Sequence, residues 1–113
     1  MRYLMLVCVD PAHELGDEEG AAIGPDTQAW VDEMDSRRVR LQGQALAGVQ
    51  DATTIRVRGG EIVVADGPFA EAKEQIAGFD ILECANLDEA LEVAAKHPVA
   101  RFGALELRPF REE

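Results

Sequence analysis

Asp66 is the residue in this sequence whose position best suits chemistry. It follows a strand-like run over residues 61–65 and comes directly before Gly67 and Pro68, which begin a new element. A carboxylate at such a strand end is expected to face the mouth of a cleft, where partial desolvation would let it act as a general base. The alternative is a capping residue whose oxygens accept backbone N–H groups two or three positions further on. Both roles are compatible, and the capping role has the larger weight.

Two further candidates lie outside the strands. Lys73 shares the apolar face of a predicted short helix with Phe69 and Ile76, so it can reach a cleft or pair with an acid. His13 lies in a loop rich in Asp, Glu and Gly, where a histidine is a candidate proton shuttle. The alternative for His13 is an exposed residue without a role. His97 is expected to stabilise a helix C-terminus with its charge.

Arginines on the predicted strands form the third group of candidates. Arg56 and Arg58 share one face of a strand, and Arg108 lies on the last strand. Arginine forks suit small anions and carboxylates, so Arg56 and Arg108 are candidate ligand-binding residues. The alternative, which we favour, is ion pairing within the chain or across a dimer with three strand glutamates: Glu61, Glu83 and Glu106.

Composition limits the class of protein. The chain has 113 residues, enough for one domain over residues 1–113, and 22 acidic against 11 basic residues give a net charge of -11. This charge repels phosphate backbones and acidic membranes, so we expect neither nucleic-acid nor membrane partners. No segment resembles a signal peptide or spans a bilayer, which predicts a cytoplasmic protein. We expect free, buried Cys8 and Cys84, no metal site and no cofactor.

Periodicity and turn signals give the element order. A two-residue Gly59-Gly60 turn predicts a hairpin, and Asn86 with Glu89 forms a capping-box pattern. A loop is expected over residues 10–25, and Gly43 and Gly78 are expected to end helices. Strands are predicted over residues 2–9, 44–47, 53–58, 61–65, 79–84 and 104–109, and helices over 26–41, from Pro68 to Gly78, and over 87–97.

This order predicts an α+β domain with a ferredoxin-like split βαβ sandwich, in which both main helices cover one face of the sheet. The first strand is nevertheless apolar on both faces, with Tyr3, Met5 and Val7 on one side and Leu4 and Leu6 on the other. Two helices cover only one face, so the other must meet another surface. The simplest supplier is a second copy, which predicts a homodimer.

The segment VADGPFAEAKEQIAG over residues 64–78 resembles the DGPF family, which is related to the YCII-like proteins. The DGPFAEAKE run is specific. Weaker similarities cover most of the chain: MRYLMLV, the segment from Gly43 to Leu46, ATTIRVRGG, LDEALEVAAKHP and GALELRPF.

The resemblance implies a ferredoxin-like fold whose sheets pack into a dimeric α/β barrel. YCII-like relatives are thought to be enzymes because of a His–Asp pair in a cleft. The Asp of that pair is carried over to Asp66, whereas the predicted helix over residues 26–41 has no histidine to complete it. The leading hypothesis is a small-molecule-binding barrel, enzymatic or not. The alternative is a non-catalytic regulatory or interaction module that acts beside an extracytoplasmic-function sigma factor.

Overall fold

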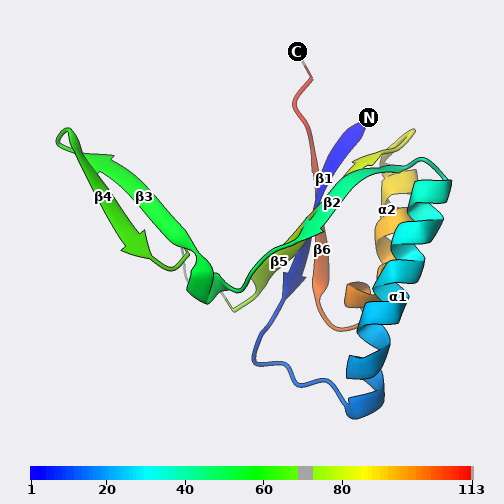
Figure 1. Ribbon diagram of the computed structural model, residues 1–113. Coiled ribbons are helices and arrows are strands. Elements are labelled where there is room, and N and C mark those ends of the chain that lie inside the picture. The colour runs from blue at the N-terminus through cyan, green and yellow to red at the C-terminus, as the bar shows by residue number, and fades with distance from the viewer. Residues whose placement is uncertain (69–72, 113) are drawn as a thin grey trace.

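The computed structural model describes residues 1–68 and 73–112. A four-stranded antiparallel sheet with the order β2-β5-β1-β6 forms the body, and β3 and β4 form a separate two-stranded hairpin (Figure 1). The elements are β1 (Arg2–Val9), α1 (Asp17–Ser36), β2 (Arg40–Ala45), η1 (Val49–Asp51), β3 (Thr53–Arg58), β4 (Glu61–Asp66), β5 (Gln75–Glu83), α2 (Leu87–Ala95), η2 (Pro98–Arg101) and β6 (Ala104–Pro109). Without the hairpin, the order of elements is β-α-β-β-α-β. The ferredoxin-like α+β prediction is therefore confirmed.

Both helices lie on one side of the sheet, as predicted (Figure 1). The core between them takes alternate residues of the central strands and one stripe of each helix. Its buried members include Tyr3, Met5 and Val7 from β1, Trp30 and Met34 from α1, Leu82 from β5, and Ala90, Val93 and Ala94 from α2. The residues between them on β1 and β5 point to the opposite side, which neither α1 nor α2 covers.

Local signals explain several elements. Asn86 Oδ1 accepts the N–H of Glu89 at 3.0 Å, and Glu89 Oε1 accepts the N–H of Ala85 at 2.9 Å, so both residues of the predicted capping box satisfy free N–H groups at the start of α2. Gly59 and Gly60 both have positive φ, as a tight hairpin turn requires.

The predicted helix over residues 26–41 is wrong at both ends. Helix α1 begins at Asp17, within the expected loop, and it contains Pro25. At the other end, Arg38 adopts φ 60, while the N–H groups of Arg38 and Val39 bond the carbonyls of Asp35 and Met34 at 3.0 and 3.1 Å. This is a Schellman motif with arginine in the position that usually holds glycine, so the sequence offers no stop signal there.

The strand predictions on either side of the hairpin are also corrected. Gly43 lies inside β2, which covers Arg40–Ala45 rather than residues 44–47. Ile76 and Gly78, expected in a short helix, belong to β5. A Cβ on Gly78 would lie 3.1 Å from the carbonyl oxygen of Gln44, so this glycine permits close approach of two strands rather than ending a helix. Phe69, in the same predicted helix, lies outside the described residues.

Cys8 and Cys84 are free; Cys84 is buried, as predicted, and Cys8 is half-buried. Among the helices described, none combines the length and the apolar character needed to cross a membrane.

Candidate small-molecule site

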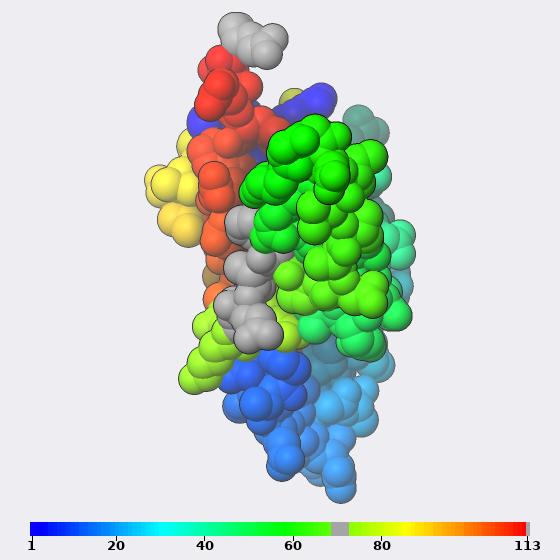
Figure 2. Space-filling model, turned by 90° about the vertical axis from the view of Figure 1, so that its left-hand side faces the viewer, coloured from blue at the N-terminus to red at the C-terminus, as the bar shows by residue number. Residues whose placement is uncertain are grey.

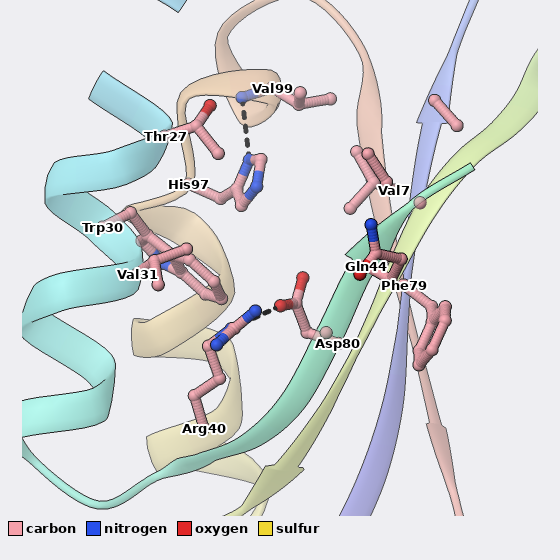
Figure 3. Close-up of a pocket in the computed structure, with 14 residues that line it drawn as sticks. Val7, Thr27, Trp30, Val31, Arg40, Gln44, Phe79, Asp80, His97 and Val99 are labelled. Atoms are coloured by element: carbon pink, nitrogen blue, oxygen red, sulfur yellow. Dashed lines mark hydrogen bonds and ion pairs between the residues drawn. The ribbon is translucent and has the colours of Figure 1, made fainter. Parts of the chain in front are cut away.

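A pocket of about 300 Å³ opens between α1 and the helix-facing side of the sheet (Figure 3). This volume lies at the lower end of the range for small-molecule sites. Apolar side chains of Val7, Trp30, Val31 and Val99 line much of it. The polar side chains in the lining are Thr27, Arg40, Gln44, Asp80 and His97. An apolar chamber with few polar groups is typical of a binding site for a small organic molecule.

Asp80 is the buried carboxylate of this pocket. It lies on β5 between Met5 of β1 and Gly43 of β2, on the face that the helices cover, and it is 6% exposed. Arg40 Nε donates to Asp80 Oδ1 at 2.8 Å, and Arg40 Nη1 also pairs with the exposed Asp35 at 3.3 Å. Burial raises the pKa of the Asp80 carboxyl, and the Arg40 guanidinium opposes this increase only in part. Asp80 is therefore a stronger base than an ordinary aspartate.

Gly43 makes room for this ion pair. A Cβ at position 43 would collide with the Asp80 carboxylate and would lie 2.7 Å from Arg40 Nη2. The pair thus lies directly over the backbone of β2, and any side chain at this position would displace it. This is the reason for a glycine inside a strand, where glycine is otherwise unfavourable.

His97 provides the second ionisable group. It is 4% exposed, and burial lowers the pKa of its imidazole to about 4, so the ring is neutral at neutral pH. Its Nδ1 accepts the N–H of Val99 at 3.1 Å. Since a neutral imidazole carries one hydrogen, that hydrogen must lie on Nε2. His97 is thus held as a hydrogen-bond donor.

Trp30 fixes the position of His97. The indole Nε1 donates to the carbonyl oxygen of Val93 at 2.9 Å, which joins α1 to α2. The two rings then meet edge to face with centroids 4.8 Å apart and an interplanar angle of 64°. Such packing restricts the imidazole to one orientation.

The two ionisable side chains Asp80 and His97 each keep one polar atom available to a ligand. Among the residues that the structure describes, neither Asp80 Oδ2 nor His97 Nε2 has a hydrogen-bond partner. No described side-chain nitrogen or oxygen is both sealed from solvent and unpaired, so these two atoms retain some accessible surface, and both residues line the pocket. Figure 3 shows both side chains directed into the space between α1 and the sheet. The pocket therefore presents an acceptor and a donor to one bound molecule.

The five residues that the sequence singled out lie elsewhere, and none lines this pocket. Asp66 is exposed at the end of β4, in the projecting hairpin. The backbone N–H groups that it was expected to cap belong to residues 69 and 70, which lie outside the described part of the chain. Arg56 lies on β3, in the same hairpin. The roles predicted for these residues stay predictions.

The remaining three residues contact other parts of the chain. Lys73 Nζ lies 4.0 Å from Asp10 Oδ2. His13 stacks on Phe102, with centroids 5.8 Å apart. Arg108 pairs with Glu106 at 3.3 Å and is exposed, which agrees with the ion-pair alternative for this arginine.

Sequence reasoning missed Asp80 and misjudged His97. The signal for Asp80 was its place in the alternation of β5, because it shares a face with Leu82 and Cys84, where an unpaired carboxylate would be costly. His97 was expected to be a charged residue in the last turn of a helix. The helix ends at Ala95, and His97 instead precedes the 3-10 helix η2 as a buried, neutral cap.

Comparison with known proteins agrees with the fold. The model of the YCII-related domain matches residues 1–113. An uncharacterized protein of Rhizobium meliloti (strain 1021) is 50% identical over 60 residues, which are 51% of this chain and 48% of that protein, so the match spans about half the length of the relative. The structure of 5-chloro-2-hydroxyhydroquinone dehydrochlorinase from Burkholderia phenoliruptrix AC1100, in complex with 2,5-dihydroxybenzoquinone, superposes with a TM-score of 0.58 and 14% identity over 100% of this chain and 96% of that one. With a family model that covers the whole chain, this protein belongs to the family of YCII-related domains.

Proposed function

We propose that this protein binds a small, neutral, oxygen-containing molecule in the pocket between α1 and the sheet, and that Asp80 exchanges a proton with it. The observation that carries the proposal is the joint exposure of Asp80 Oδ2 and His97 Nε2 to one apolar chamber. A ligand with a carbonyl oxygen and a nearby acidic hydrogen would meet both atoms at once.

The two groups suit opposite halves of one proton transfer. Asp80 accepts a proton from an O–H, or from a C–H beside a carbonyl, and its raised pKa makes it a better base at neutral pH. The electron pair of the broken C–H bond moves toward the carbonyl, and the His97 N–H hydrogen-bonds the oxygen on which negative charge develops. A neutral imidazole donates this bond without transferring its own proton, so protonated Asp80 returns the abstracted proton to the oxygen or to another carbon of the ligand, and the reaction supported is a tautomerisation.

The charge of the pocket favours neutral ligands. Arg40 has the Asp80 carboxylate at 2.8 Å and the Asp35 carboxylate at 3.3 Å, so its charge is already matched. An anionic ligand would have to enter an apolar chamber beside a carboxylate, in a chain with a net charge of -11. The structural neighbour binds a dihydroxybenzoquinone, but at 14% identity it supports the fold alone.

The test is a thermal-shift and calorimetric screen of small cyclic ketones and hydroxy ketones, with 2,5-dihydroxybenzoquinone included as the ligand named for the neighbour. We expect at least one neutral compound to raise the melting temperature of the wild type. Asp80→Asn should abolish that shift relative to its own baseline. Asp35→Asn is the matched control, because Asp35 contacts the same arginine without lining the pocket.

Proton transfer is tested separately from binding. The C–H of a bound ketone should exchange with D₂O faster in the presence of wild-type protein, and proton NMR detects this as loss of the C–H signal. Asp80→Asn should remove the acceleration, and Asp35→Asn should retain it. Equal binding of every probe to the wild type and to Asp80→Asn would refute the assignment of the site.

A further inference from the structure

The pocket between α1 and the sheet has a buried end and an exposed end. Asp80 and His97 are 6% and 4% exposed, so the two ionisable groups lie at the buried end. Among the described residues that line the pocket, only Gln44 and Ala45, the last two residues of β2, are exposed to solvent. β2 is an edge strand of the four-stranded sheet. The pocket therefore opens at the edge of the sheet, beside the end of β2, and we call this opening the mouth.

Two rows of strand residues form the floor of the pocket. Gly43 lies beside Asp80 in the first row, and Ala45 lies beside Gly78 in the second row. Val7 of β1 continues the second row on the other side of Gly78. Because residues two positions apart on a strand are separated by about 7 Å, the second row lies about 7 Å beyond the first. The path from Asp80 to the mouth is therefore about as long as a small ring with one substituent.

Small residues leave space above the second row. Gly78 has no side chain and Ala45 has only a methyl group, and both lie on the face of the sheet that α1 covers. Any side chain at position 78 would enter the space between the sheet and α1, and its Cβ would lie 3.1 Å from the carbonyl oxygen of Gln44. Ala45, Gly78 and Val7 carry no polar side-chain atom, in contrast to Asp80 in the first row. The passage from the buried end to the mouth is therefore apolar.

The β3–β4 hairpin follows β2 in the sequence but does not cover the mouth. Helix α1 lies on one side of the four-stranded sheet, and the hairpin projects on the other side (Figure 1). Viewed from the hairpin side, the hairpin lies in front of the body (Figure 2). The mouth lies on the helix side, between α1 and the end of β2. A ligand group that reaches Ala45 therefore contacts the protein on its inner side and solvent on its outer side.

We propose that the ligand is a cyclic ketone with a short alkyl substituent opposite its carbonyl group, and that Ala45 sets the length of the substituent that fits. This inference rests on the function proposed above, which places the carbonyl group between Asp80 and His97. A ring in that position extends toward the mouth, so the substituent lies over Gly78 and Ala45. Burial of the substituent on this apolar surface increases affinity by about fourfold for each methylene removed from water. The increase ends where the alkyl chain passes Ala45 and enters solvent.

The experiment measures by calorimetry the affinity for cyclohexanone and for its methyl, ethyl and propyl derivatives substituted opposite the carbonyl group. In the wild type, affinity should rise with each added methylene and then level off. Ala45→Leu fills the mouth, so the ratio of propylcyclohexanone affinity to cyclohexanone affinity should fall at least about tenfold. This ratio is independent of any general loss of binding or folding in the variant. Ala47→Leu is the matched control, because Ala47 is exposed and does not line the pocket, and it should keep the wild-type ratio.

The outcomes separate this inference from the function on which it rests. Affinity that rises along the series in the wild type, with a ratio lowered only in Ala45→Leu, supports the inference. It is overturned if the wild type binds none of these ketones, if affinity does not rise with alkyl length, or if Ala45→Leu and Ala47→Leu change the ratio equally. The proposed function falls only if no compound of the wider screen depends on Asp80 for binding. Asp80-dependent binding of cyclohexanone with no effect of alkyl length would therefore overturn this inference alone.

Discussion

Protonation of His97 should destabilise the folded state in a defined pH interval. Burial lowers the pKa of this imidazole from 6.5 to about 4, so between these values the unfolded chain binds a proton that the folded chain does not. The contribution of His97 to stability is therefore complete above about pH 6.5 and is lost as the pH falls toward 4. At about 1.4 kcal/mol per pH unit, the loss amounts to about 3 kcal/mol. This is a large part of the roughly 5–15 kcal/mol that stabilises an average domain.

The assay is urea denaturation of the wild type and of His97→Asn at several pH values between 7.5 and 4. Asparagine keeps an oxygen that can accept the N–H of Val99, but it does not ionise. Surface carboxylates such as Glu33 and Glu92 have pKa values lowered by Lys96 and Arg37. They titrate in both proteins, so their contributions to the pH dependence of stability cancel when wild type and variant are compared. The difference in free energy of unfolding between wild type and variant should shrink by about 3 kcal/mol as the pH falls. A constant difference, or an NMR titration of His97 near 6.5, would refute the reasoning.

Four further substitutions test other parts of the structure by chemical denaturation. Gly43→Ala should destabilise the protein by about 1–3 kcal/mol and reduce binding of any compound found in the ligand screen, because the added methyl displaces the buried ion pair. Gly20→Ala, in α1, should instead stabilise it by about 0.5–1 kcal/mol, because the new methyl would meet only Leu15 Cβ, at an ordinary contact distance of 3.9 Å. Arg38→Gly should add about 1 kcal/mol, since it relieves a left-handed backbone conformation at φ 60, and a loss of stability would contradict that geometry. Trp30→Phe should lose about 1 kcal/mol or more with its buried hydrogen bond, and an unchanged midpoint would show that this bond contributes nothing.

The sequence was sufficient to predict features that depend on residues only a few positions apart. The capping residues of α2 and the glycine pair of the hairpin act within a few positions, and both predictions are confirmed. The ends of α1 were missed because Arg38 occupies the position where a glycine would have marked the stop. The extent of β2 and β5 was missed because Gly43 and Gly78 serve contacts between strands, which only the folded chain brings together.

The candidate site was harder to predict because its two groups act through burial. Asp80 and His97 are separated in the sequence by the whole of α2, and neither belongs to the DGPF motif that drew attention to Asp66. Their surroundings in the folded chain set their chemistry. Burial raises the pKa of Asp80 against the opposing effect of Arg40. Burial lowers the pKa of His97, and the N–H of Val99 fixes which ring nitrogen carries the hydrogen. The sequence alone can identify Asp80 as an acidic residue at a core-facing position. It cannot show that Arg40 lies close enough to pair with the carboxylate and offset the cost of burying it.

The alternation along β5 gives the Arg40–Asp80 pair a role in folding accuracy. Phe79 and Asp80 are neighbours with opposite orientations, so a slip of β5 by one residue would exchange them. The slipped strand would bring an aromatic ring against Arg40, leave the guanidinium without Asp80, and put the carboxylate among the leucines of β1. Arg40 would keep only the exposed Asp35 as a partner, and the loss of the buried half of an ion pair costs more than a misplaced apolar group, so such a pairing is penalised. The ion pair thus selects one strand register among several that hydrophobic contacts alone would tolerate.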